Sequence, residues 1–303
     1  MTDERRRAVV RTPATSANLG PGFDSFGLCL GLYDDLAAMV TAGGLHIVVS
    51  GEGAGVGELP RDETHLVIRA MRAAFDVLGV SQPGLALTAT NRIPHGRGLG
   101  SSAAAIVAGL RLAQMLGPES SLTDAAALEL AAQLEGHPDN VAACLLGGFT
   151  VAWMEGGVPG ALRLDVHHDI RATALIPPRP LSTEVARGLL PGTVGHADAA
   201  TNAARSGLLV AALTGHPALL LTATDDRLHQ AYRAAAMPES LSLVEALRTR
   251  GLAAVVSGAG PAVLVLSTSA AQHQIADLVP TGWQLAELAI DQQGCTSYAG
   301  SVE

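Results

Sequence analysis

The sequence contains no lysine, so all 19 of its permanently cationic side chains are arginines. This absence excludes the lysine of a Walker-type phosphate loop, a lysine Schiff base and any proton transfer that uses a lysine amine. Every cationic contact to a ligand must therefore come from arginine or histidine. Backbone N–H groups must supply the remaining hydrogen bonds to an anion.

Cysteine is also scarce. Only Cys29, Cys144 and Cys295 occur, far apart and without the short spacing of a zinc or redox motif. We interpret them as isolated thiols in a reducing compartment. Arg6 and Arg7 near the N-terminus are not followed by the apolar core of an export signal, and no apolar run reaches membrane-spanning length. We therefore expect a cytoplasmic protein with no membrane contact.

Aromatic residues make up 3% of the chain and charged residues 16%, whereas 48% are hydrophobic, which is ample for a full core. The formal net charge of −9 argues against a nucleic-acid partner, which would require a basic stripe. The 303 residues suffice for two ordinary domains. We place the boundary in the loop Glu155–Gly160, which gives domains 1–157 and 158–303.

The order of the predicted elements indicates an α+β fold. In the first half we expect strands at 8–12, 85–91 and 149–154, β-type runs between 26 and 50, a loop at 13–22, and helices at 64–78, 101–116, 124–134 and 138–146. In the second half we expect strands at 162–176, 253–257, 262–267 and 283–290, and helices at 182–190, 199–213, 218–235, 240–250 and 270–278.

The strongest local pattern is a glycine-rich loop that leads directly into a predicted helix: Pro94-His95-Gly96-Arg97-Gly98-Leu99-Gly100-Ser101-Ser102-Ala103-Ala104. Glycines permit positive φ and close backbone approach, and a helix start offers unpaired N–H groups at the positive end of its dipole. The two serine hydroxyls can bond a phosphate or face a metal ion. The pattern therefore predicts a phosphate site without lysine. A capped turn into a buried small-residue helix is the purely structural alternative.

This loop resembles the ATP-binding motif of the GHMP kinases, and other segments extend the resemblance over nearly the whole chain. Residues 13–27 resemble the first family motif as homoserine kinases carry it. Residues 135–142, Glu-Gly-His-Pro-Asp-Asn-Val-Ala, are similar to another segment of those enzymes, and residues 257–261, Ser-Gly-Ala-Gly-Pro, resemble the third family motif.

The resemblance implies the two-domain GHMP kinase fold, with a ribosomal-protein-like α/β domain at the N-terminus and a ferredoxin-like α+β sandwich at the C-terminus. It implies ATP and Mg²⁺ as cofactors, L-homoserine as the substrate and a homodimer. Other GHMP kinases use an Asp–Lys pair as the base. The lack of lysine excludes that pair and favours homoserine over mevalonate as the acceptor.

Homoserine is a zwitterion with a hydroxyl arm, so its site needs an anion, a cation and polar groups at the hydroxyl. The resemblance implies that Asp24 contacts the ammonium group and that Arg187 and Arg233 contact the carboxylate, which suits the guanidinium fork. Without the resemblance, all three would be interpreted as surface residues. The polar groups implied for binding and catalysis at the reacting hydroxyl are Asn18, His137 and Asn140.

For the nucleotide, the resemblance implies contacts from the whole loop 94–104, from His65 near the adenine, and from a second glycine-rich loop through Ser257, Gly258 and Gly260. A plain hairpin turn is the alternative for that second loop.

For the metal, the resemblance implies Ser101 and Ser102 together with a carboxylate. Homoserine kinases commonly carry a glutamate three residues before the glycine of Glu-Gly-His, but this chain has Gln133 there. Magnesium prefers carboxylates, phosphate oxygens and water. We expect Glu129, one helical turn earlier, to replace it; Glu135, or phosphates and serine alone, are the alternatives.

Two other functions stay open. One is a neighbouring GHMP kinase that acts on L-threonine or an isoprenoid alcohol. The other is a catalytically silent GHMP-fold binding protein, for which Gln133 is the single supporting feature.

Overall fold

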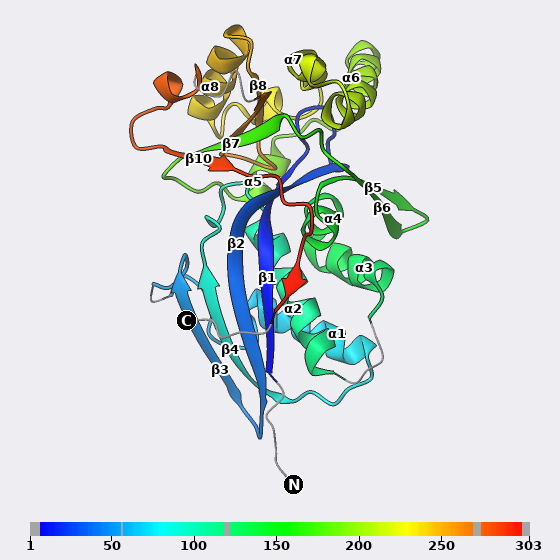
Figure 1. Cartoon of the computed structure of the whole chain (residues 1–303), viewed down its shortest axis with the longest axis vertical. Coiled ribbons are helices and arrows are strands. Elements are labelled where there is room, and N and C mark those ends of the chain that lie inside the picture. Colours follow the sequence, from blue (N-terminus) through cyan, green and yellow to red (C-terminus); the bar gives the residue numbers. More distant parts are fainter. Residues whose placement is uncertain (1–6, 56, 118–121, 269–273, 299–303) are drawn as a thin grey trace.

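The computed structural model describes residues 7–55, 57–117, 122–268 and 274–298. Two sheets, each covered by helices, lie one above the other in Figure 1. The lower sheet has seven strands: β1 (Arg7–Ala17), β2 (Phe26–Thr41), β3 (Leu45–Gly51), β4 (Gly84–Asn91), β5 (Phe149–Glu155), β6 (Val158–Leu164) and β11 (Thr296–Ser297). Their order is β11-β1-β2-β4-β3, and β5 pairs with both β2 and β6.

The predicted loop 13–22 is shorter in the structure, because β1 continues to Ala17. The register of β1 against β2 shifts between Pro13 and Ala14, which is expected where proline donates no N–H to the ladder. Beyond the shift, Ala14 to Ala17 pair with β2 again and are buried. The loop is thereby reduced to residues 18–25, which we call the first loop.

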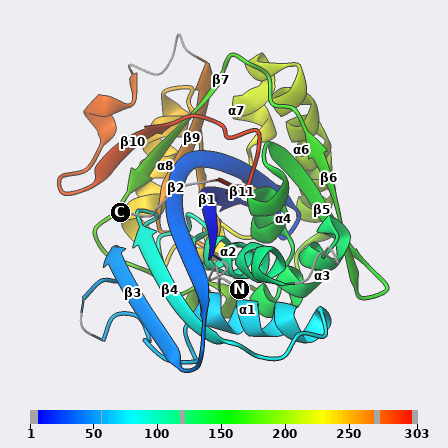
Figure 2. The same ribbon diagram turned by 60° about the horizontal axis from the view of Figure 1, so that its bottom comes forward.

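Four helices cover one side of this sheet: α1 (Leu66–Val77), α2 (Ser101–Leu116), α3 (Asp124–Glu135) and α4 (Asp139–Leu146). In Figure 2, β2, β4 and β3 curve around one side of α1 and α2. The two helices approach closely because α2 carries small residues. A Cβ at Gly109 would collide with the carbonyl of Val67 on α1. Ten residues of α2, from Ala103 to Leu116, are buried in the core.

The upper sheet is antiparallel in the order β10-β7-β9-β8. Its strands are β7 (Ile170–Ile176), β8 (Ala253–Val256), β9 (Val263–Thr268) and β10 (Gln284–Leu288). The helices beside it are α5 (Thr183–Gly188), α6 (His196–Thr214), α7 (Leu220–Ala223) and α8 (Pro238–Thr249), with 3₁₀ turns at Pro217–Leu219, Ala231–Arg233 and Ala276–Leu278. The mixed α/β content and two-part architecture expected from the sequence are confirmed.

Three predicted elements differ in the structure. The strand expected at 162–176 is divided between β6 and β7. The helix expected at 218–235 is broken, because the carboxylate of Asp226 accepts the backbone N–H groups of Leu228, His229 and Gln230 and so competes with helical bonding. The helix expected at 270–278 lies partly outside the described residues, and its end forms only the last 3₁₀ turn.

The predicted boundary loop Glu155–Gly160 is the turn of the β5–β6 hairpin. Gly156 and Gly157 turn the chain with φ of 59° and 87°, and β6 then pairs antiparallel with β5 in the lower sheet. The lower sheet thus extends past residue 157, and after the upper sheet the chain returns to it through β11. The chain passes from one sheet to the other between β6 and β7.

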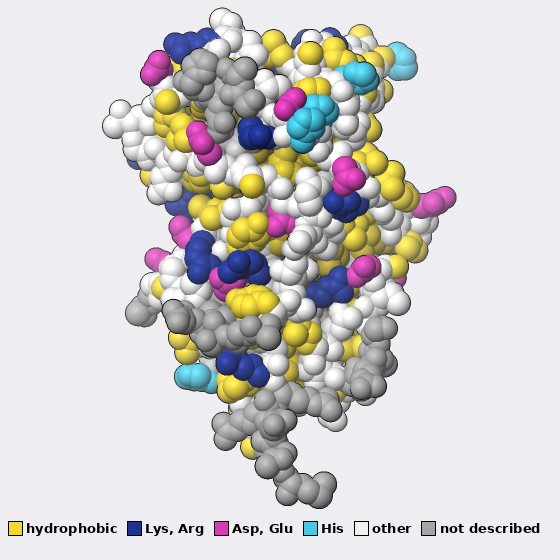
Figure 3. Space-filling model, in the orientation of Figure 1, with side chains coloured by type: hydrophobic (Ala, Val, Ile, Leu, Met, Phe, Trp, Pro, Cys, Tyr) yellow, Lys and Arg dark blue, Asp and Glu magenta, His cyan; other side chains and the backbone are white. Residues whose placement is uncertain are grey.

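Charged side chains of both signs are interspersed on the face seen in Figure 3. The nearly buried carboxylate of Asp35 on β2 pairs with Arg11 on β1 and with Arg92 after β4, both at 2.8 Å. Within the part of the chain that the structure describes, no helix is long and apolar enough to cross a membrane.

Candidate active site

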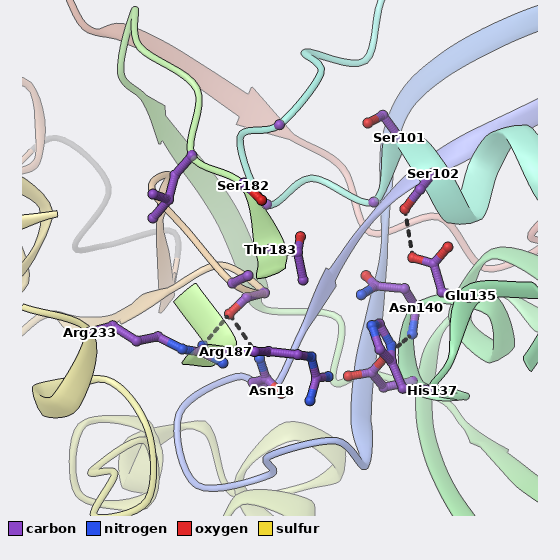
Figure 4. A pocket seen from close by; sticks show the side chains of 17 residues that line it. Asn18, Ser101, Ser102, Glu135, His137, Asn140, Ser182, Thr183, Arg187 and Arg233 are labelled. Carbon is purple, nitrogen blue, oxygen red and sulfur yellow. Dashed lines mark hydrogen bonds and ion pairs between the residues drawn. The ribbon is translucent and has the colours of Figure 1, made fainter. Parts of the chain in front are cut away.

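A cavity of about 200 Å³ lies where the loops of the two sheets meet. Figure 4 shows side chains from both halves of the chain pointing into it. Of the residues predicted from the sequence, those that line the cavity are Asn18, Gly96, Gly98, Gly100, Ser101, Ser102, His137, Asn140, Arg187, Arg233 and Gly258. Segments more than 200 residues apart in the sequence, such as those of Asn18 and Gly258, therefore form one site.

The glycine-rich loop forms one wall of the cavity. Gly96, Gly98 and Gly100 have φ of 65°, 75° and 72°, in the left-handed region that favours glycine. Gly100 is the N-cap of α2 and no side chain of the described residues caps the helix. The first N–H groups of α2 have no helical partner, and the residues at this helix start line the cavity, where such groups could bind an anion.

The close approach that Gly98 permits is to the protein itself. A Cβ there would collide with the carbonyl oxygens of Ser257 and Gly260, and the Ser257 hydroxyl donates to the Gly98 carbonyl at 2.6 Å. Ser257 and Gly260 do not line the cavity, whereas Gly258 does. The second glycine-rich loop therefore holds the first in place, and of its residues Gly258 and Ala259 border the cavity.

Some predicted nucleotide contacts point elsewhere. Arg97 donates to the carbonyls of His95 at 2.6 Å and Pro178 at 2.7 Å, so its guanidinium ties the loop to the segment before α5 instead of facing the cavity. The side chains that are buried in the surrounding structure and do not line the cavity are Pro94, Leu99, Ala103 and Ala104.

A second cavity, of about 430 Å³, shares Ser101 and Ser102 with the first. Its walls are largely apolar, and His65 and His95 both line it. His65 is buried and neither ring nitrogen has a hydrogen-bond partner among the described residues. Burial lowers the pKa of His65 to about 4, so the neutral ring offers one donor and one acceptor.

The first loop is held in an uncommon conformation. Asn18, Leu19 and Asp24 have φ of 69°, 50° and 53°, a region that non-glycine residues seldom adopt and that is frequent at functional sites. The Asn18 side chain accepts from the N–H of Asp24 at 2.9 Å and donates to the carbonyl of Gly258 at 2.8 Å. Both ends of this amide thus fix the loop, and one lone pair of its oxygen remains for a ligand.

The two arginines differ in their partners. Arg187 forms a bidentate ion pair with Asp24, at 3.1 and 2.6 Å, and this bond raises the Arg187 pKa. Arg233 is 1% exposed and has no carboxylate within ion-pair distance among the described residues. Its Nη1 donates to Nδ1 of His229 at 2.9 Å and to the Gly258 carbonyl at 3.2 Å. A buried cation without an anion is costly, so an anionic ligand would stabilise this arrangement.

The segment between α3 and α4 supplies the opposite wall (Figure 4). Ser102 donates to Glu135 at 2.6 Å, and burial raises the pKa of that carboxyl. Nδ1 of His137 bonds to Asp139 at 2.7 Å. Burial lowers the His137 pKa, but the bond to Asp139 and the negative charges of Asp139 and Glu135 together outweigh it, so the net shift is upward. Thr15 donates to Oδ1 of Asn140 at 2.8 Å, which leaves the Asn140 amide group as a donor toward the cavity.

The structure does not bring Glu129 to the cavity. Its exposed side chain lies next to Gln133 on α3, at 3.5 Å, and neither residue lines the site. The alternative, Glu135, faces Ser102. Within the described residues no group of three or more acidic, histidine or cysteine side chains forms a metal cage. A metal ion here would therefore be held partly by its phosphate ligand.

The sequence interpretation missed several residues of the site. Asp139, Ser182 and Thr183 line the cavity, and Thr15 and His229 orient residues that do. Helical spacing offered a signal for two of them, because Thr183 and His229 each lie four positions before an arginine of the site.

Known proteins resemble this chain over nearly its full length. The family model described as "GHMP kinases N terminal domain" matches residues 65–148, and "GHMP kinases C terminal" matches residues 208–283. A homoserine kinase of Streptomyces coelicolor is 56% identical over 95% of this chain and 93% of its own, and one of Clavibacter michiganensis is 52% identical over 96% and 94%. The crystal structure of homoserine kinase from Cytophaga hutchinsonii covers 98% of this chain and 99% of its own, with a TM-score of 0.85 and 27% identity.

Proposed function

This chain belongs to the homoserine kinases of the GHMP kinase family, and we propose that its cavity binds L-homoserine and ATP through the residues described above. The reaction transfers the γ-phosphoryl group of Mg-ATP to the side-chain hydroxyl of L-homoserine and yields O-phospho-L-homoserine, a step of threonine biosynthesis. ATP and Mg²⁺ are the cofactors of this activity.

The buried charge of Arg233 is the observation that carries the substrate assignment. A fully buried guanidinium without a carboxylate partner in the described residues lies beside the Asp24–Arg187 ion pair. An α-amino acid carries the missing anion together with a cation for Asp24. In this proposal the carboxylate binds Arg233 and Arg187, the ammonium group binds Asp24 and the free lone pair of Asn18, and the hydroxyl arm extends toward α2.

For the nucleotide, the two cavities that meet at Ser101 and Ser102 fit the two ends of ATP. The apolar cavity takes the base, and the neutral ring of His65 supplies its unused donor and acceptor. His95 lines the same cavity. The phosphates lie at the uncapped start of α2, along Gly96, Gly98 and Gly100.

For the metal, the hydroxyl of Ser102 and the carboxylate of Glu135 are hard oxygen donors of the kind that Mg²⁺ prefers. Ser101 is the second hydroxyl in reach of the phosphates, and Glu135 replaces Glu129 in our assignment. When bound, the ion neutralises charge on the phosphates of ATP.

Catalysis in this site rests on positioning and charge stabilisation. Asn140, oriented by Thr15, donates its amide N–H toward the space between the hydroxyl and the phosphates. His137, held by Asp139, lies beside it. Together with the N–H groups of α2, these donors stabilise the negative charge on the transferred group and keep the hydroxyl in line.

The expectations for assembly, location and partners stay predictions. We expect a homodimer in the cytoplasm, with no nucleic-acid partner and no membrane contact.

The proposal is tested by following ADP release with L-homoserine, L-threonine, L-serine and mevalonate as acceptors. We expect turnover with L-homoserine at a kcat/KM at least about 100-fold above the others, since a site built for paired charges rejects ligands that leave them unpaired. Turnover of L-threonine or mevalonate alone would contradict it. Binding of ATP without turnover of any acceptor would favour the silent binding protein.

A further inference from the structure

His229 lies next to the site without lining it. It belongs to the turn between α7 and α8, four residues before Arg233, and its side chain is fully buried. Its two ring nitrogens contact two different parts of the substrate site. Nε2 lies 2.8 Å from the carbonyl oxygen of Gly20 in the first loop, and Nδ1 lies 2.9 Å from Nη1 of Arg233.

These two contacts determine the protonation state of the ring. A carbonyl oxygen can only accept, so Nε2 must carry the hydrogen that bonds to Gly20. A guanidinium can only donate, so Nδ1 must be the acceptor for Arg233. His229 is therefore the neutral tautomer with the proton on Nε2, and burial, which lowers its pKa, favours the same neutral form.

A ring stack adds a second constraint on the arginine. The ring of Phe23, also in the first loop, stacks on His229 with centroids 5.3 Å apart and planes at 29°. The guanidinium carbons of Arg187 and Arg233 each lie 5.6 Å from the centre of the Phe23 ring. The face of Phe23 thus limits where both cations can lie, while the bond from His229 fixes the direction in which Arg233 presents its remaining N–H groups.

We infer that His229 is a positioning residue for substrate binding: it orients Arg233 toward the carboxylate of homoserine, while its bond to Gly20 holds the ring in the tautomer that accepts from Arg233. The inference rests on the proposed function, because it assigns the orientation of a residue that we place against that substrate. His229 does not touch homoserine. Its effect should therefore appear in the affinity for homoserine and not in the affinity for ATP.

The experiment uses two variants, each of which can replace the hydrogen bond of one ring nitrogen but not that of the other. In His229→Gln the side-chain amide can still donate to Gly20 from the position of Nε2, but the acceptor for Arg233 is lost. In His229→Asn the amide oxygen can replace Nδ1 as that acceptor, while the bond to Gly20 is lost. KM for homoserine, KM for ATP, kcat and thermal stability are measured for the full-length protein and both variants.

We expect His229→Gln to raise the homoserine KM by about tenfold or more, the loss of one charge-assisted hydrogen bond, with the ATP KM changed less than about twofold. His229→Asn should stay within about threefold of the wild type in both constants. In an Arg233→Ala background, His229→Gln should have no further effect on the homoserine KM, because a residue that acts through Arg233 has nothing left to orient.

Other results overturn the inference. An unchanged homoserine KM in a folded His229→Gln protein, or equal increases in both variants, would mean that His229 only fills space. If His229→Gln does not fold, a tenfold KM increase in His229→Asn overturns it and a KM near the wild type supports it. Failure of the wild type to phosphorylate homoserine contradicts the proposed function instead, so the two failures are distinguishable.

Discussion

Arg187 donates from Nη1 and Nη2 of its guanidinium to the two carboxylate oxygens of Asp24, at 3.1 and 2.6 Å, across 163 positions of sequence. The pair joins the first loop to α5, and of its two residues Arg187 lines the cavity. Each partner is also the group that we assign to one end of the substrate. A ligand that binds to only one of the two residues weakens the Asp24–Arg187 ion pair and leaves the charge of the other residue without full compensation.

This relationship predicts selection for zwitterions. Homoserine offers an ammonium group to Asp24 and a carboxylate to Arg187, so both charges stay compensated on binding. We expect 4-hydroxybutyrate and 3-aminopropan-1-ol, which each keep the hydroxyl arm but lack one charge, to show a kcat/KM at least about 100-fold below homoserine, because an unpaired polar group in the site is costly. The measurement is ADP release at saturating ATP. Comparable turnover of either analogue would contradict the assignment of Asp24 and Arg187.

The two arginines should differ in their contribution to substrate binding. Arg233→Ala and Arg187→Ala should each raise the homoserine KM by roughly tenfold to a hundredfold, the loss of about 1.5–3 kcal/mol of charge-assisted bonding. The Arg233 change should lie at the upper end, because Arg233 is buried and has no carboxylate partner in the described residues. The ATP KM should hardly move. Arg250→Ala, an exposed arginine at the end of α8, is the control. If neither variant changed the homoserine KM, the carboxylate site would have to lie elsewhere.

The metal assignment is tested with three substitutions on α3 that exchange a carboxylate and an amide. Glu135→Gln should increase the Mg²⁺ concentration for half-maximal activity by roughly fivefold to thirtyfold, about 1–2 kcal/mol for one charge-assisted contact. Glu129→Gln should leave it unchanged, because Glu129 is exposed outside the cavity. Gln133→Glu should also have little effect in this geometry. Half-saturation is read from Mg²⁺ titrations at saturating substrates. A large effect at Glu129 with none at Glu135 would reverse the assignment.

The sequence predicted the helices of the lower half closely, because their boundaries are local properties. Gly117 and Gly136 each follow the last residue of a helix, and the Thr123 hydroxyl accepts the N–H of Ala126 at the start of α3. The extension of β1 to Ala17 was missed because pairing with β2 is a tertiary effect that overrides a local Pro/Gly signal. The break between α7 and α8 was missed because Asp226 competes for backbone N–H groups through its side chain.

The sequence motifs predicted which segments form the site but not how their side chains are oriented. A motif marks a segment and does not say which of its side chains face the ligand. Arg97 and Ser257 belong to recognisable motifs, yet both bond to the protein's own carbonyls. The assignment of the metal to Glu135 instead of Glu129 has the same origin. Which glutamate faces the cavity depends on the direction of the chain between α3 and α4. The unpaired state of Arg233 is visible only when the burial of the whole side chain is known.

The last prediction concerns Asp34, which lies on β2 and lines the second cavity. Burial raises the pKa of this carboxyl to about 6. The hydrogen bonds that its Oδ1 accepts from the N–H groups of Arg92 and Ile93, at 2.6 and 2.9 Å, lower the pKa but do not offset the effect of burial. Because the folded pKa lies above the unfolded value, the protonated form favours folding. This contribution is complete below about pH 4 and is lost as the pH rises through 6.

Asp34→Asn keeps the acceptor oxygen and removes the charge. We expect its free energy of unfolding, relative to the wild type, to increase between pH 4.5 and pH 7 and to stay constant above, by up to about 3 kcal/mol for a pKa shift of about two units. Urea denaturation of both proteins across this range measures the difference, and Asp277→Asn, exposed in the 3₁₀ turn Ala276–Leu278, is the control. A difference that does not change with pH would show that the Asp34 carboxyl titrates at the same pH in the folded and unfolded protein. The ionised carboxylate beside the second cavity would then not lower the stability of the fold.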